Sequence, residues 1–86
     1  MNFNEVNFEF AICDDCIFIH HLWIDHKFRK QHRLRNAIDD LMKIYHKSIV
    51  LESFETLIKM YEHIGFYQTG EYDDQGYVVM RKDFLL

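Results

Sequence analysis

The chain has 86 residues, of which 49% are hydrophobic and 16% aromatic, so a disordered protein is excluded and one packed domain over residues 1–86 is expected. A formal net charge of -4 argues against a protein that coats DNA through many Lys and Arg contacts to phosphates. No apolar run reaches the ~18 residues of a membrane span and no signal-type segment opens the chain, so we expect a cytoplasmic protein with reduced cysteines.

The first part of the chain predicts two strands. Residues 6–12 alternate between apolar and polar side chains, which is typical of a strand with one buried face. After Asp14 and Asp15, residues 16–24 form a second β-rich run that is apolar almost throughout, which favours a strand covered on both faces. The two acidic turn residues between these runs predict a hairpin.

The apolar period then becomes helical. It predicts a helix from Leu34 to Tyr45, with Lys47 near its C-terminal end. Residues 49–51 read as a short buried strand. A second helix is expected over residues 54–64, with Ser53 as a candidate cap. Its inward stripe is predicted to contain Phe54, Leu57, Ile58 and Tyr61.

A terminal hairpin completes the chain. Residues 66–72 and 77–82 are the expected strands, and the acidic turn at 73–76 joins them. The order β-β-α-β-α-β-β indicates an α/β domain with a mixed sheet, in which residues 49–51 run parallel beside residues 19–24.

One short motif suggests a family. Tyr61 stands four residues before Gly65, and Phe66 follows. This spacing resembles the L-Y-x-x-x-G-F signature of the GNAT superfamily of acetyl-CoA-dependent N-acetyltransferases. The resemblance implies that Tyr61 is the general acid that protonates the departing CoA thiolate. A purely structural role, with Tyr61 in the core and Gly65 ending a helix, remains the alternative.

The order of elements is also similar to the C-terminal two-thirds of a GNAT domain. The resemblance implies a partial GNAT-like fold that lacks the N-terminal strand and two helices. In the family, those elements normally line the side of the active site that binds the acceptor substrate.

A basic segment coincides with the position of the family's pyrophosphate loop. Residues 27–35 hold five Lys or Arg and no acid, which suits a small polyanion. By resemblance, the CoA pyrophosphate loop comprises Arg29, Lys30, Gln31, His32, Arg33 and Leu34. His32 and Leu34 occupy the family's two glycine positions, where backbone amides normally approach the phosphates. Trp23 and Ile24 would offer backbone groups to the pantetheine arm.

The sequence does not identify the residue that would act as general base. Acetyl transfer requires a neutral amine, which a carboxylate or a histidine can provide. His20 and His21 are adjacent in the second strand and are expected on opposite faces of the sheet. Either is a candidate base or an ordinary structural histidine, and the acceptor amine is unknown.

Two other interpretations remain. Cys13 and Cys16 have the spacing of half a zinc site, although they also fit the closing pair of a hairpin. The chain also fits a catalytically inactive GNAT-fold interaction protein, such as a small viral or mobile-element inhibitor of a host protein. Because a short chain without its N-terminal cover would expose apolar sheet, a homodimer is expected in either case.

Overall fold

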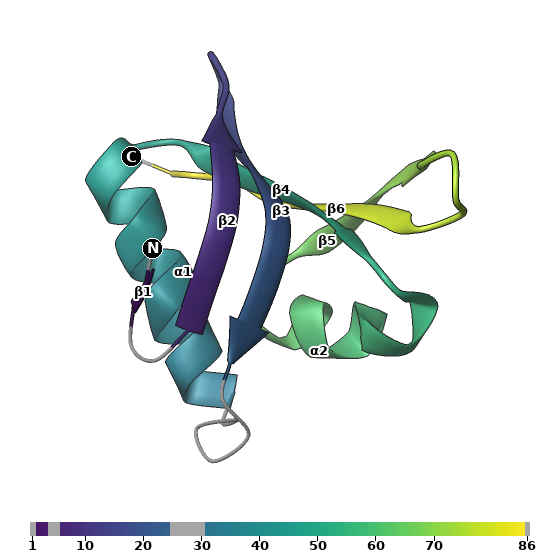
Figure 1. Cartoon of the computed structure of the whole chain (residues 1–86), viewed down its shortest axis with the longest axis horizontal. Helices are drawn as coiled ribbons and strands as arrows, with labels where there is room; N and C mark the ends of the chain where they lie inside the picture. Colours follow the sequence, from purple (N-terminus) through teal and green to yellow (C-terminus); the bar gives the residue numbers. More distant parts are fainter. Residues whose placement is uncertain (1, 4–5, 25–30, 86) are drawn as a thin grey trace.

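The computed structural model of the protein describes residues 2–3, 6–24 and 31–85. In this part of the chain six strands form one sheet in the order β1-β2-β3-β4-β6-β5 (Figure 1). The strands are β1 (Asn2–Phe3), β2 (Val6–Ile12), β3 (Cys16–Ile24), β4 (Ser48–Ser53), β5 (Tyr67–Tyr72) and β6 (Val78–Lys82). The helices are α1 (Gln31–Tyr45) and α2 (Ile58–His63), and a 3₁₀ turn at Glu55–Leu57 precedes α2.

The sheet is mixed. β3 and β4, which flank α1 in the sequence, are parallel, and every other neighbouring pair is antiparallel. The predicted α/β class, the order of elements from β2 onward and the parallel pair are therefore confirmed. The parallel pairing joins Cys16–Ile19 to residues 48–51, so it uses the first half of β3 rather than residues 19–24.

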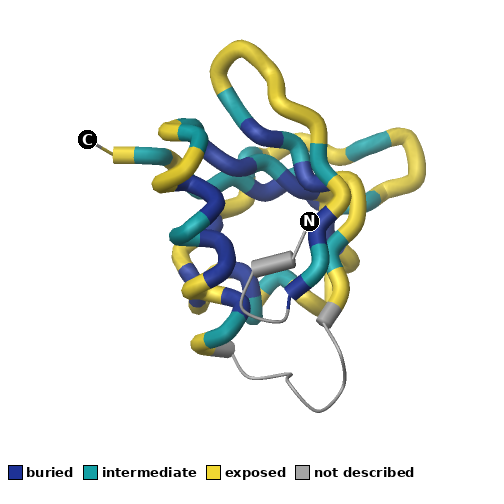
Figure 2. Tube along the Cα trace, turned by 60° about the vertical axis from the view of Figure 1, so that its left-hand side comes forward, coloured by how far each residue is buried: buried dark blue, intermediate teal, exposed yellow. Residues whose placement is uncertain are grey.

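Both helices cover the same face of the sheet. α1 lies beside β2 and α2 beside β5 (Figure 1). Lys82 of β6 connects them, because its Nζ donates to Asp39 Oδ1 of α1 and to the carbonyl of Ile64 just after α2. Figure 2 shows the buried stretches gathered toward the middle of the molecule. The helices and the inward side of the strands form a single core of Val6, Phe8, Ile17, Ile19, Leu34, Ala37, Ile38, Leu41, Met42, Ile49, Leu51, Tyr61, Ile64, Phe66, Val78 and Met80.

The opposite face of the sheet is more open. Phe18 and Val50, which are register partners on β3 and β4, are only half-buried, and Trp23 is 43% exposed. The expectation that residues 16–24 are covered on both faces is therefore wrong. Apolar residues follow one another in β3, but the described helices both pack on one side of it. No helix in the part of the chain that the structure describes is long and apolar enough to cross a membrane.

The second helix differs from its prediction. Phe54 and Leu57 are exposed rather than inward, and the α-helical part begins only at Ile58. The 3₁₀ turn has about 3.0 residues per turn, so its side chains do not continue the stripe of an α-helix. Ser53 is not the cap, since its hydroxyl donates to the carbonyl of Phe54. Tyr61 nevertheless points inward, as expected, and is 7% exposed.

Candidate functional site

A β-bulge in β3 opens the sheet. Phe10 of β2 pairs with Ile19, whereas Glu9 pairs with His21, so His20 is an extra residue on β3. The parallel pairing with β4 ends one residue earlier, at Ile19 and Leu51. Beyond this point β3 and β4 diverge, as Figure 1 shows. The backbone beyond the divergence is therefore not used in pairing between these two strands.

A cavity of about 590 Å³ lies at this opening. It collects residues from both diverging strands, from the segment that leads into α2, from α2 itself and from the turn between β5 and β6. Its lining consists of Ile19, His20, His21, Leu22, Leu51, Glu52, Ser53, Phe54, Leu57, Tyr61, Asp73, Asp74, Gln75 and Tyr77.

Tyr61 is the buried residue of α2 and its side chain lines this cavity. The ring packs edge-on against Phe66, with 5.6 Å between the ring centroids. Burial raises the pKa of Tyr61 above its ordinary value, because the phenolate would lose solvation. The phenol therefore keeps its proton at neutral pH and can donate it.

The chain turns sharply after Tyr61. The Phe66 N–H donates to the Tyr61 carbonyl over 3.0 Å, and Gly65 between them has a φ of 105°. This is the left-handed helix end anticipated as the structural alternative for Gly65. The tyrosine, glycine and phenylalanine thus fix the turn, and the same turn holds the phenol at the cavity.

Two carboxylates at the cavity share a hydrogen bond. The pKa of Glu52 is raised, chiefly by its hydrogen bond with Asp73, then by burial and by the charges of Asp73 and Asp74. The pKa of Asp73 is lowered, first by that hydrogen bond and then by backbone N–H groups of the turn, including that of Tyr77. Of the two carboxyl groups, Glu52 therefore binds a proton more readily than Asp73. The sequence analysis did not name Glu52 as a candidate, although an acidic residue at the end of a buried strand could have indicated a functional site.

His20 and His21 both line the cavity, so the expectation that they face opposite sides of the sheet is wrong. The bulge is the reason, because an extra residue interrupts the alternation of a strand. The rings make edge contacts with their own strand: His20 with Phe18, and His21 with Trp23. A role as base remains a prediction for both.

The predicted cofactor residues that the structure describes are not part of the cavity lining. Tyr61 and the two candidate bases, His20 and His21, are in its lining. Trp23 is exposed on β3, and Ile24 is the last residue of that strand. Arg29 and Lys30 lie outside the described residues.

The remaining predicted residues form the first turn of α1. Gln31 begins the helix, His32 is exposed, Arg33 is half-buried and Leu34 is in the core. The Leu34 side chain therefore belongs to the core and not to the exposed surface of this turn. The N-terminus of a helix of this length suits an anion.

The cysteine pair closes the hairpin. The Cys13 N–H donates to the carbonyl of Cys16 over 2.8 Å, and both thiols are free. Burial raises the pKa of Cys16, and a hydrogen bond with Cys13 adds to this. Within the described ranges, no three His, Cys, Asp or Glu side chains are grouped so as to hold a metal ion.

No family model matches this sequence, and no curated protein matches it. Solved structures of acetyltransferases are similar to the fold. A candidate N-acetyltransferase from Lactobacillus plantarum superposes with a TM-score of 0.68 at 20% identity, over 93% of this chain and 59% of that one. The ribosomal-protein-S18-alanine N-acetyltransferase from Escherichia coli gives 0.65 at 18% identity, over 95% and 63%.

A candidate GNAT-family acetyltransferase from Bacteroides thetaiotaomicron gives a TM-score of 0.67 at 17% identity, over 90% of this chain and 53% of that one. The protein therefore has a partial GNAT fold, as its sequence predicted. It spans only 53–63% of the length of these structures.

Proposed function

We propose, from the GNAT fold and the cavity at Tyr61, that the protein transfers an acetyl group from acetyl-CoA to an amine. The observation that carries the proposal is the buried phenol at the point where β3 and β4 diverge. A proton donor held in protonated form suits the departure of a thiolate. The neighbours support the fold alone, so the reaction rests on this geometry.

Several features of the chain fit the cofactor. Beyond Ile19 and Leu51 the edges of β3 and β4 that face each other are no longer paired, so they would offer hydrogen bonds to an extended arm. The cavity beside them has room for a small acyl group. The N-terminus of α1, with Arg33 and the preceding basic segment, would hold the pyrophosphate. When bound, acetyl-CoA supplies the acetyl group and a thiolate leaving group.

The chain's own residues would handle the protons. In this proposal Glu52 accepts a proton from the acceptor ammonium, which the raised direction of its pKa supports. Tyr61 would donate its phenolic proton to the departing thiolate. Because both side chains line the same cavity, one site can serve both transfers.

Calorimetric titration with acetyl-CoA and with desulfo-CoA tests the proposal, followed by a thiol-release assay with a panel of amines. We expect binding in the micromolar to millimolar range and thiol release that depends on an amine. A chain that gives no heat with either ligand at millimolar concentration is not an acetyltransferase.

The second candidate is a GNAT-fold interaction protein without catalytic activity. The half-buried Phe18 and Val50, together with the exposed Trp23, favour it, because they leave apolar sheet accessible to a partner. A homodimer formed over this face is compatible with both candidates. The proposal includes a cytoplasmic location, which the free thiols of Cys13 and Cys16 suit.

A further inference from the structure

The described lining of the cavity is acidic. It contains three carboxylates, Glu52, Asp73 and Asp74, and no Lys or Arg. His20 and His21 are its only other ionisable groups apart from the tyrosines. An ammonium group entering this cavity would therefore meet no Lys or Arg side chain of the described lining.

Among the described residues, no Lys or Arg forms an ion pair with a cavity carboxylate. Ion pairs join Arg81 to Asp83 and Lys82 to Asp39. Glu52 and Asp73 are instead hydrogen-bonded to each other. This hydrogen bond means that the two groups share a proton, and the negative charge that remains on them, together with that of Asp74, attracts a cation.

One wall of the cavity is aromatic. Phe54 and Tyr77 meet edge-on, with 4.9 Å between their ring centroids, and Phe54 is 57% exposed. Tyr77 follows the acidic turn directly, so the aromatic pair and the carboxylates belong to one surface. Such a surface suits an aliphatic chain with a cation at its end, because methylene groups pack on the rings and an ammonium favours both a ring face and a carboxylate.

A simple monoamine would keep the contact with the aromatic rings but lose its attraction to the carboxylates before it reacts. The reacting amine must lose its proton, so its own positive charge disappears before the transfer. A second cationic group on the same molecule would keep its charge and its attraction to Asp74 and Asp73 throughout.

We infer that the acceptor is an amine that carries a second positive charge, and that Asp74, at the acidic turn between β5 and β6, is a specificity-determining residue for it. The transfer step rests on the proposed function, whereas the binding of the dication does not. The shared chemistry fits a small aliphatic diamine and the side chain of a lysine flanked by another basic residue.

Titrations without acetyl-CoA test the binding. The probes are 1,4-diaminobutane and 1-aminobutane, which have the same chain length and differ in one ammonium group. We expect the diamine to bind about 10-fold more tightly, as a few partly exposed carboxylates each contribute a modest factor. Raising the salt concentration should weaken the diamine more than the monoamine. Equal affinities would overturn the inference.

Variants locate the effect. Asp74→Asn should lower the affinity for the diamine by about 2–5-fold, the range of one exposed ion pair. Glu71→Gln removes the same charge from β5, outside the cavity lining, and should change neither affinity. If the two variants weaken the diamine equally, the effect is one of net charge and the assignment of Asp74 fails.

Two further experiments distinguish a small-molecule acceptor from a peptide acceptor, and the acetyltransferase proposal from the proposed dication site. Spermidine and a short Lys-Lys peptide replace the diamine, and the tighter ligand identifies the source of the acceptor. Diamine binding without any CoA binding would refute the acetyltransferase, while the dication site at Asp74 would stand. Acetyl transfer that is equally efficient with both butylamines would refute the inference while the acetyltransferase stands.

Discussion

Lys82 of β6 reaches across the inner face of the sheet to Asp39 of α1, with 3.0 Å between Nζ and Oδ1. The same ammonium donates to the carbonyl of Ile64 over 2.9 Å. One side chain therefore joins the last strand to both helices. The Asp39 side chain is 43% exposed, so solvent weakens the ion-pair part of the interaction, and the bond to the Ile64 carbonyl should matter at least as much.

We expect Lys82→Met to lower the free energy of unfolding by about 1–2 kcal/mol, since the variant keeps the aliphatic stem and loses both hydrogen bonds. Urea denaturation measures the change. Lys43→Met, at an exposed position of α1, is the matched control and should cost much less. Equal losses in the two variants would show that the bridge does not stabilise the fold.

Gly65 is required for two separable reasons. Its φ is 105°, and an added Cβ would lie 3.0 Å from Cε of Lys82. Gly76 has a φ of 85° but no atom within 4 Å of such a Cβ. Gly76→Ala should therefore cost only the backbone strain of about 1–2 kcal/mol, and Gly65→Ala should cost more. Thermal or urea unfolding of both variants tests this order, and a smaller loss for Gly65→Ala would contradict it.

Tyr61→Phe separates chemistry from binding. The variant keeps the ring contact with Phe66 and removes the phenolic proton. If the protein is an acetyltransferase, turnover should fall about 10²–10⁴-fold while the affinity for acetyl-CoA stays nearly constant. Tyr72→Phe, at an exposed position outside the cavity, is the control. Unchanged turnover would remove Tyr61 from the mechanism.

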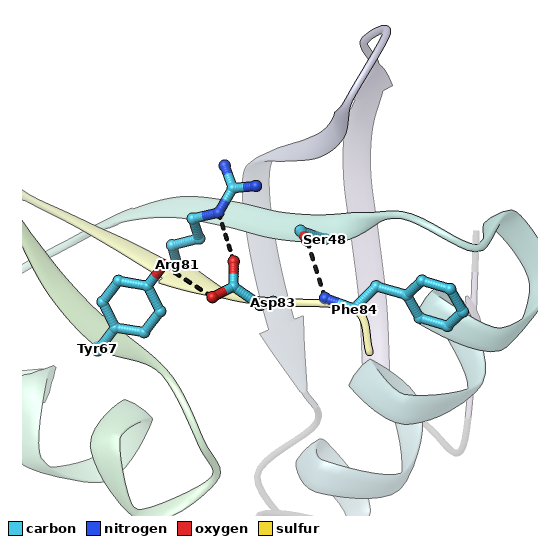
Figure 3. A network of polar contacts seen from close by, with 5 residues as sticks. All are labelled: Ser48, Tyr67, Arg81, Asp83 and Phe84. Carbon is cyan, nitrogen blue, oxygen red and sulfur yellow. Dashed lines mark hydrogen bonds and ion pairs between the residues drawn. The ribbon is translucent and has the colours of Figure 1, made fainter. Parts of the chain in front are cut away.

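The network around Asp83 predicts a pH dependence of stability (Figure 3). Arg81 Nε donates to Oδ1 of Asp83 over 2.7 Å, and the Tyr67 hydroxyl donates to Oδ2 over 3.0 Å. The hydrogen bond from Arg81, followed by the one from Tyr67, lowers the pKa of Asp83 in the folded protein. The stabilisation that the Asp83 carboxylate gives to the folded protein is complete above its unfolded pKa of about 3.9. It is lost as the pH falls through the lower pKa of the folded state.

Asp83→Asn should therefore destabilise the protein at neutral pH and make the loss of stability below about pH 4 less steep. Urea denaturation at a series of pH values measures both effects. Glu62→Gln, an exposed substitution on α2, is the comparison. An acid limb of the same slope in the Asp83 variant and the native protein would show that this network does not contribute to acid unfolding.

The open face of the sheet leads to a prediction about self-association. We expect a dimer by light scattering at micromolar concentration, because Phe18 and Val50 remain accessible on this face. Val50→Glu should shift the protein toward the monomer. Ile44→Glu alters an apolar residue that is 58% exposed on α1 and should leave the dimer intact. A native protein that is already monomeric at this concentration would refute the prediction.

The sequence by itself determined most of the secondary structure and its order. Apolar residues alternate in residues 6–12 and recur with a helical period after Leu34. These repeats show which side chains are buried, because the side chains on one face of a strand or helix recur with the period of that element. The strand β2 therefore has its predicted range, and α1 ends at Tyr45 as predicted but begins at Gln31 rather than Leu34. The Tyr61, Gly65 and Phe66 spacing was also readable, because a positive φ after a helix calls for glycine.

Only the tertiary structure decided the composition of the site. The bulge at His20 arises from the register between β2 and β3, so no periodicity within β3 alone could reveal it. That bulge places both histidines at the cavity. Glu52 and Asp73 meet although 20 residues separate them, since the β4–β6–β5 pairing returns the acidic turn to the end of β4. Local patterns encode the pitch and burial of single elements, whereas side-chain proximity across strands depends on their register and divergence, which the packing of the whole sheet sets.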